Sequence, residues 1–206
     1  DPKNADLADL GMVMENVYHT KDDMIDCVNA FYEGMVRRSE EMKRHPNYKT
    51  GENYAYLGLP PCFLIFDEYV AFFEMLGTKE SVGLLSQLKK IVMLGRQAGY
   101  FLIVACQRPD AKYFSDGIRD NFNFRVGLGR ISELGYGMLF GSDVKKQFFQ
   151  KRIKGRGYCD VGTSVISEFY TPLVPKGHDF LQTIGSLAQA RQDVTATCEA
   201  KGDGTD

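Results

Sequence analysis

Residues 62–68 have the sequence CFLIFDE, in which five apolar residues of strand length are followed directly by two acids. Pro60 and Pro61 stand immediately before this run. A continuous apolar run bounded in this way is typical of a strand buried on both faces, as in a parallel sheet. We therefore expect a strand over residues 62–66 that ends at Asp67 and Glu68.

A helix and a second strand are predicted next along the chain. Apolar residues recur at helical spacing between Lys79 and Gln97, and Gly99 is a typical helix stop. A second apolar run, YFLIVAC, follows at residues 100–106. Two buried strands joined by a helix form a βαβ unit, which predicts an α/β fold with a mainly parallel sheet and flanking helices.

Further elements are expected on either side of this unit. Thr20 is a suitable N-cap for a helix of about 20 residues that ends near Arg44. On the carboxyl side we expect a third strand at Phe122–Leu128 and a hairpin between Gly157 and Tyr170.

The composition is that of an ordinary globular protein. The 206 residues include 25 Lys and Arg against 27 Asp and Glu, a net charge of -2, so any contact with DNA must be local. The 5 cysteines form no CxxC pair, which excludes zinc ribbons and thioredoxin-like motifs and indicates reduced thiols. We expect a core over residues 1–180 and a disordered polar tail over residues 181–206.

Polar side chains follow both predicted parallel strands. Asp67 and Glu68 follow the first strand and Gln107 follows the second, so all three are expected at one edge of the sheet. An Asp in such a place can hold Mg²⁺, an adjacent Glu can orient or deprotonate a water, and an amide can contact that water or a phosphate. The alternative is that strands end in polar residues simply because loops are polar.

Motifs for other kinds of site are missing from the sequence. No segment matches the phosphate-binding pattern GxxxxGK[ST], so the chain by itself is expected not to hold or hydrolyse ATP in the usual way. HExxH, GxSxG and a GxGxxG after a strand are also missing, and the 3 histidines are His19, His45 and His178. A histidine-based site is therefore not expected.

Basic residues offer two further possibilities. A basic strip interleaved with phenylalanines could follow a phosphate backbone, although a solvated helix face is the more frequent explanation. The strip consists of Lys145, Lys146, Lys151, Arg152, Lys154 and Arg156. Arg119 and Arg125 could reach the phosphates of a neighbouring subunit, and a surface salt bridge is the alternative for each.

Several motifs together resemble one protein family. They are DPK at residues 1–3, a helix with MVRR at residues 35–38, the strand ending in Asp67 and Glu68, LGRQAG at residues 94–99, ACQRP at residues 105–109, and GRG at residues 155–157. From residue 1 to about residue 173 this order resembles the RecA-like motor of the FtsK/SpoIIIE DNA translocases, a P-loop ATPase core. The combination of LGRQAG with ACQRP is its most specific part.

The resemblance implies a hexameric ring in which ATP and Mg²⁺, bound between subunits, drive double-stranded DNA through the centre. Asp67 matches the Mg²⁺ position, Glu68 the water-activating position and Gln107 the polar position after the sensor strand. The segment 118–128 resembles a family segment that favours Arg125 over Arg119 as the intersubunit contact. Lys112 would be a phosphate contact in a DNA-facing loop.

Some features depart from the family pattern. The phosphate-binding strand and loop are expected upstream of Asp1, Cys106 replaces the usual Thr, and residues 155–160 lack the usual GxGDM ending. These departures favour a coupling protein of a conjugative element, with a chromosome-partitioning translocase as the alternative. A noncatalytic assembly or docking module is the alternative from another class. The parent protein is expected at the cytoplasmic face of the membrane, held there by parts outside this soluble, cytoplasmic chain.

Overall fold

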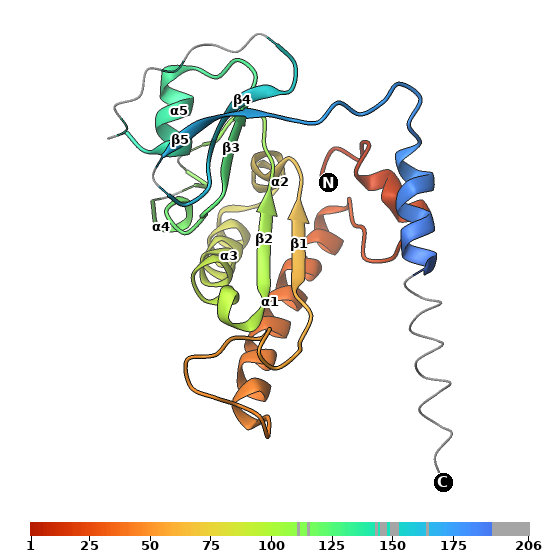
Figure 1. The fold of residues 1–206 in the computed structure, drawn as a ribbon, viewed down its shortest axis with the longest axis vertical. Coiled ribbons are helices and arrows are strands. Elements are labelled where there is room, and N and C mark those ends of the chain that lie inside the picture. Colours follow the sequence, from red (N-terminus) through yellow and green to blue (C-terminus); the bar gives the residue numbers. More distant parts are fainter. Residues whose placement is uncertain are drawn as a thin grey trace.

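The fold was analysed in a computed structural model, which describes residues 1–110, 112–114, 116–142, 144, 148, 153–163 and 165–190. Within these residues a two-stranded parallel sheet and a three-stranded antiparallel sheet are present. Figure 1 shows the antiparallel sheet beyond the arrowheads of the parallel strands, and the N-terminus beside the arrowhead of β1.

The elements follow one another along the chain as η1 (Ala8–Met12), α1 (Lys21–Arg44), β1 (Cys62–Phe66), α2 (Tyr69–Glu74), α3 (Thr78–Ala98), β2 (Tyr100–Val104), α4 (Asp116–Arg119), β3 (Arg125–Leu128), α5 (Glu133–Phe140), β4 (Arg156–Asp160) and β5 (Ile166–Tyr170). Residues 180–190 are also helical. The first part of the segment 181–206, which was expected to be disordered, is therefore a helix, and residues 191–206 lie outside the described residues. The domain boundary at residue 180 stays a prediction.

The predicted βαβ unit is confirmed. β1 and β2 pair in parallel, in a register that runs from Cys62 opposite Tyr100 to Phe66 opposite Val104. The connection includes α3, which packs against α1 and β2. Leu64 and Phe66 of β1 lie in one core with Val28 of α1 and Leu88 of α3. The α/β prediction therefore holds for this part of the chain.

The expectation that β1 is buried on both faces was wrong. Leu64 and Phe66 are buried, but Phe63 and Ile65, which point the other way, are 55% and 57% exposed. Ile103 of β2 is likewise exposed. The helices α1 and α3 contribute to the core that contains Leu64 and Phe66, and an apolar run cannot by itself indicate which face of a strand is covered.

The helix α1 begins where the sequence predicted. The Thr20 hydroxyl accepts a hydrogen bond from the Asp23 backbone amide at 3.3 Å, which satisfies one of the unpaired donors of the first turn. The helix ends at Arg44, before Pro46, and its buried face includes Met24, Val28 and Met35.

The antiparallel sheet has the order β3-β4-β5. Its β4 and β5 form the predicted hairpin, and β3 occupies the end of the predicted third strand. Tyr136 and Phe140 of α5 pack with Tyr158 and Ile166 in a second core. Two cores are thus present among the described residues, and the parallel pair of strands belongs to the first.

Glycines at the end of α3 give the LGRQAG motif a structural reason. Gly99 has φ +77°, a left-handed conformation that ends α3 and that glycine adopts without steric cost. A Cβ on Gly95 would lie 2.3 Å from the Tyr100 carbonyl oxygen, so only glycine allows α3 to pass this close to β2. Both glycines therefore set how the helix meets the strand.

We predict that Gly95→Ala destabilises the protein by about 2 kcal/mol or more, because the added methyl group must displace backbone. Gly83→Ala in the same helix is the matched control, since a Cβ there meets nothing within 4 Å. That change should be neutral or stabilising by up to about 1 kcal/mol. Thermal unfolding measures the stability of both variants. Equal stabilities of Gly95→Ala and Gly83→Ala would contradict the packing argument.

Candidate functional site

The ends of the two parallel strands bring the predicted polar residues together. The ladder continues past the strands, because the Ala105 amide donates to the Phe66 carbonyl at 2.8 Å and the Tyr69 amide donates to the Ala105 carbonyl at 3.0 Å. Gln107 Nε2 donates to Glu68 Oε1 at 3.0 Å. The predicted proximity is confirmed, and we call Asp67, Glu68 and Gln107 the strand-end site.

Glu68 has an unusual backbone conformation. Its φ and ψ are 48° and 45°, in the left-handed region, which costs a non-glycine residue of the order of 1–2 kcal/mol. The Asp67 carboxylate stabilises the turn by accepting the Glu68 amide at 2.9 Å. The buried α2 begins at Tyr69, whose hydroxyl donates to the Tyr113 carbonyl at 3.3 Å. Packing of α2 therefore holds Glu68 in a conformation that it would not adopt alone.

One contact of the strand-end site was not predicted from the sequence. The Lys3 ammonium group donates to Glu68 Oε1 at 2.6 Å, across 65 positions of sequence. Lys3 was recognised only as part of the DPK motif, without a role. No pattern at Lys3 itself indicates its partner, because the contact depends on where the N-terminal segment lies relative to β1.

One carboxylate of the strand-end site fits Mg²⁺ as a ligand. Asp67 uses Oδ1 to accept the Glu68 amide, and within the described residues no partner is recorded for Oδ2. No group of three or more His, Cys, Asp or Glu side chains in that part of the chain could hold a metal alone. Mg²⁺ is commonly bound through one or two carboxylates with waters and phosphates. Asp67 therefore fits this ion as a single ligand.

The two candidate arginines have partners in their own chain. Arg125 Nη2 donates to Asp160 Oδ2 at 2.8 Å and its Nη1 donates to the Leu139 carbonyl at 3.2 Å. Asp160 is only 5% exposed in its side chain, so this pair joins β3 to β4 inside the fold. Arg119 Nε donates to Asp120 at 3.1 Å. A role for Arg125 in a neighbouring subunit would require an internal ion pair to break.

Of the basic residues predicted to contact DNA, Lys112 lies in the described part of the chain. Lys112 is exposed, and its ammonium group donates to the Tyr113 hydroxyl at 2.9 Å, which raises the pKa of Lys112. It is therefore charged and accessible, as a phosphate contact requires. Lys145, Lys146, Lys151 and Arg152 lie outside the described residues. Their DNA-binding role stays a prediction.

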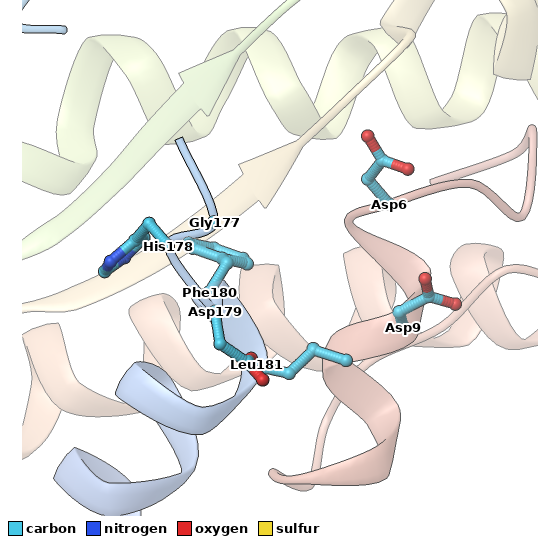
Figure 2. Close-up of a pocket in the computed structure, with 7 residues that line it drawn as sticks. All are labelled: Asp6, Asp9, Gly177, His178, Asp179, Phe180 and Leu181. Atoms are coloured by element: carbon cyan, nitrogen blue, oxygen red, sulfur yellow. The ribbon is translucent and has the colours of Figure 1, made fainter. Parts of the chain in front are cut away.

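An open pocket lies between the N-terminal segment and residues 177–181 (Figure 2). Its lining includes Asp6, Asp9, His178 and Asp179, and none of the predicted site residues takes part. The pocket is therefore separate from the strand-end site. No helix in the described part of the chain has the length and apolar character needed to cross a membrane.

Cys106 lies between the second strand and Gln107. Partial burial raises the pKa of its thiol to about 11, and the neighbouring charges of Glu68 and Asp67 contribute to this increase. A negative carboxylate disfavours the thiolate, which is the reactive form. Cys106 is therefore a protonated, weakly reactive thiol at neutral pH.

The strain at Glu68 can be measured with two substitutions. Glu68→Gly and Glu68→Ala both remove the carboxylate and its hydrogen bonds, but only Ala keeps a Cβ in the left-handed conformation. We expect the Gly variant to be more stable by about 1 kcal/mol, or roughly 2–4 °C in Tm. Differential scanning calorimetry would show this difference, and an Ala variant as stable as the Gly variant would contradict the strained backbone.

The thiol of Cys106 reports the charge of the strand-end site. Glu68→Gln should lower the pKa of Cys106 from about 11, because a negative neighbour is removed, and so should speed alkylation at a fixed alkaline pH. Glu74→Gln, an exposed acid on α2, is the control and should leave the rate unchanged. Mass spectrometry of the Cys106 peptide measures the rate. Equal rates in all three proteins would refute the electrostatic coupling.

The sequence has a curated relative. No model of a known protein family matches the chain. It is 54% identical over 207 residues to the FtsK domain-containing protein YdcQ of Bacillus subtilis strain 168, an alignment that covers 100% of this chain and 43% of that protein. The chain therefore spans less than half the length of this relative.

Solved structures show the fold. The cytoplasmic domain of the type VII secretion ATPase EccC from Thermomonospora curvata matches with a TM-score of 0.58 and 17% identity, over 84% of this chain and 21% of that chain. The monomer form of the pCW3 conjugation coupling protein TcpA with ATPγS matches with a TM-score of 0.57 and 18% identity, over 73% of this chain and 44% of that chain. ATPases 2 and 3 of EssC from Geobacillus thermodenitrificans match with a TM-score of 0.53 and 15% identity, over 84% of this chain and 32% of that chain.

The likeness to these structures shows that the chain has the RecA-like P-loop ATPase fold, to which the parallel pair of β1 and β2 belongs. The 54% identity to an FtsK domain-containing protein over the whole of this chain shows that the chain belongs to the FtsK/SpoIIIE family.

Proposed function

We propose that the chain is part of an ATP-driven translocase of double-stranded DNA, and that the strand-end site is where ATP is hydrolysed. The observation that carries the proposal is the hydrogen bond from Gln107 to Glu68 at the carboxyl ends of two parallel strands. Ligands of open α/β sheets bind at this edge. The family membership and the length of the relative support a larger ATPase that contains this chain.

Each residue of the strand-end site has a role in the proposed reaction. Glu68 orients the attacking water and accepts its proton as the new bond to the terminal phosphorus forms and the bond to the bridging oxygen breaks. Asp67 would hold Mg²⁺, which offsets the charge on the phosphates when bound. Gln107, which donates to Glu68, would also contact the water.

DNA transfer during conjugation is the preferred setting for this activity. The fold likeness to a conjugation coupling protein agrees with it, but the likeness to secretion ATPases has a similar TM-score. Duplex DNA is therefore the substrate that must be tested. A hexameric ring, DNA contact through Lys112, and attachment to the membrane through other parts of the protein belong to the same proposal.

The test is ATP hydrolysis by the full-length protein that contains this chain, with and without duplex DNA. We expect DNA to stimulate turnover, and Glu68→Gln to lower kcat roughly 100-fold or more while ATP still binds. Glu74→Gln on α2 is the matched control and should behave as the wild type.

Each contrary result removes a different part of the proposal. Turnover that DNA does not stimulate would refute the translocase and keep the ATPase. An unchanged kcat in Glu68→Gln would remove Glu68 from the reaction. A full-length protein that neither binds nor hydrolyses ATP would favour a noncatalytic docking module on this fold.

A further inference from the structure

Lys3 reaches the strand-end site from a distant part of the chain. Its Nζ lies 2.6 Å from Glu68 Oε1, and the side chains of Lys3 and Glu68 are 43% and 17% exposed. The N-terminus lies beside the arrowhead of β1 in Figure 1, which is where Glu68 follows the strand. The carboxylate that the proposed reaction uses therefore has a cationic partner.

The segment that carries Lys3 is organised by local hydrogen bonds. The Asp1 carboxylate accepts the amides of Lys3 at 2.9 Å and of Ala5 at 3.0 Å. The Asn4 amide donates to the Asp1 carbonyl at 3.2 Å, which closes a turn with Pro2 at its second position, where proline is favoured. Lys3 is thus presented from a defined turn.

Both donors to Glu68 use the same carboxylate oxygen. Lys3 Nζ and Gln107 Nε2 each donate to Oε1, at 2.6 Å and 3.0 Å. Among the described residues no donor to Oε2 is recorded. A carboxylate held at one oxygen in this way has a fixed orientation and keeps its second oxygen available as an acceptor.

We infer that Lys3 is a positioning residue for Glu68, and that its ammonium group and the Gln107 amide fix Oε1 so that Oε2 accepts the attacking water. This inference rests on the proposed function of the strand-end site. Lys3 acts through Glu68 and contributes to orientation, on which rates depend steeply.

A matched ion pair elsewhere in the chain distinguishes this role from that of an ordinary surface salt bridge. Lys21 Nζ lies 3.0 Å from Glu80 Oε1, and their side chains are 36% and 42% exposed. Lys21 resembles Lys3 in exposure, but its partner is outside the strand-end site. If Lys3 merely added a surface ion pair, Lys3→Met and Lys21→Met would behave alike.

The experiment measures kcat and KM for ATP in the full-length protein with saturating duplex DNA. We expect Lys3→Met to lower kcat roughly 10- to 100-fold with KM within about twofold of the wild type, because orientation of the water is lost and nucleotide binding is not. Lys3→Arg should recover most of the activity, since it restores a cationic donor. Lys21→Met should match the wild type.

A double-variant test asks whether Lys3 acts through Glu68. In a Glu68→Gln background, adding Lys3→Met should lower the remaining single-turnover rate by much less than it does in the wild type. Thermal unfolding is measured for every variant. If Lys3→Met does not fold, the comparison of Lys3→Arg with Lys3→Gln replaces it, and Gln should lose the rate that Arg keeps.

Each of the following results would overturn the inference. Wild-type kinetics in Lys3→Met, or equal rates in Lys3→Gln and Lys3→Arg, would show that the contact has no role in turnover. A raised KM for ATP with an unchanged kcat in Lys3→Met would show that Lys3 contributes to nucleotide binding instead. If Lys3→Met lowered the rate in the Glu68→Gln background as much as in the wild type, Lys3 would act independently of Glu68. A wild type without turnover would instead refute the proposed function itself, and this inference with it.

Discussion

The parallel pairing of β1 and β2 is the constraint on which the rest of the structure depends. It brings Asp67 and Glu68 to the same edge of the sheet as Gln107. The pairing continues beyond the strands, because the Ala105 amide donates to the Phe66 carbonyl and the Ala105 carbonyl accepts from the Tyr69 amide. The close approach of α3 at Gly95 sets the path from one strand to the other. A change in this register would separate groups that must lie within hydrogen-bond distance.

Local patterns predicted much of the fold. The capping of α1 at Thr20, the apolar runs of β1 and β2, and the left-handed end of α3 at Gly99 are each determined by neighbouring residues, and each lies where the sequence placed it. The proximity of Gln107 to Glu68 followed because parallel strands end at a common edge.

Contacts between distant segments could not be predicted in this way. The bond from Lys3 to Glu68 and the pairing of Arg125 with Asp160 each depend on the assembled fold. The same holds for the exposed face of β1, since an apolar strand has the same sequence whether one face or both are covered. The left-handed conformation of Glu68 is opposed by its own side chain and exists because the buried α2 follows it directly.

The uncovered face of the parallel pair has a consequence for behaviour in solution. Phe63, Ile65 and Ile103 present apolar surface to water, and the ring of Phe63 stacks on that of Phe101. Contact between two such surfaces releases ordered water and is favoured as concentration rises. Two copies of the chain by itself can therefore associate through this face, so a dilute preparation and a concentrated one would differ in particle size without any change in secondary structure.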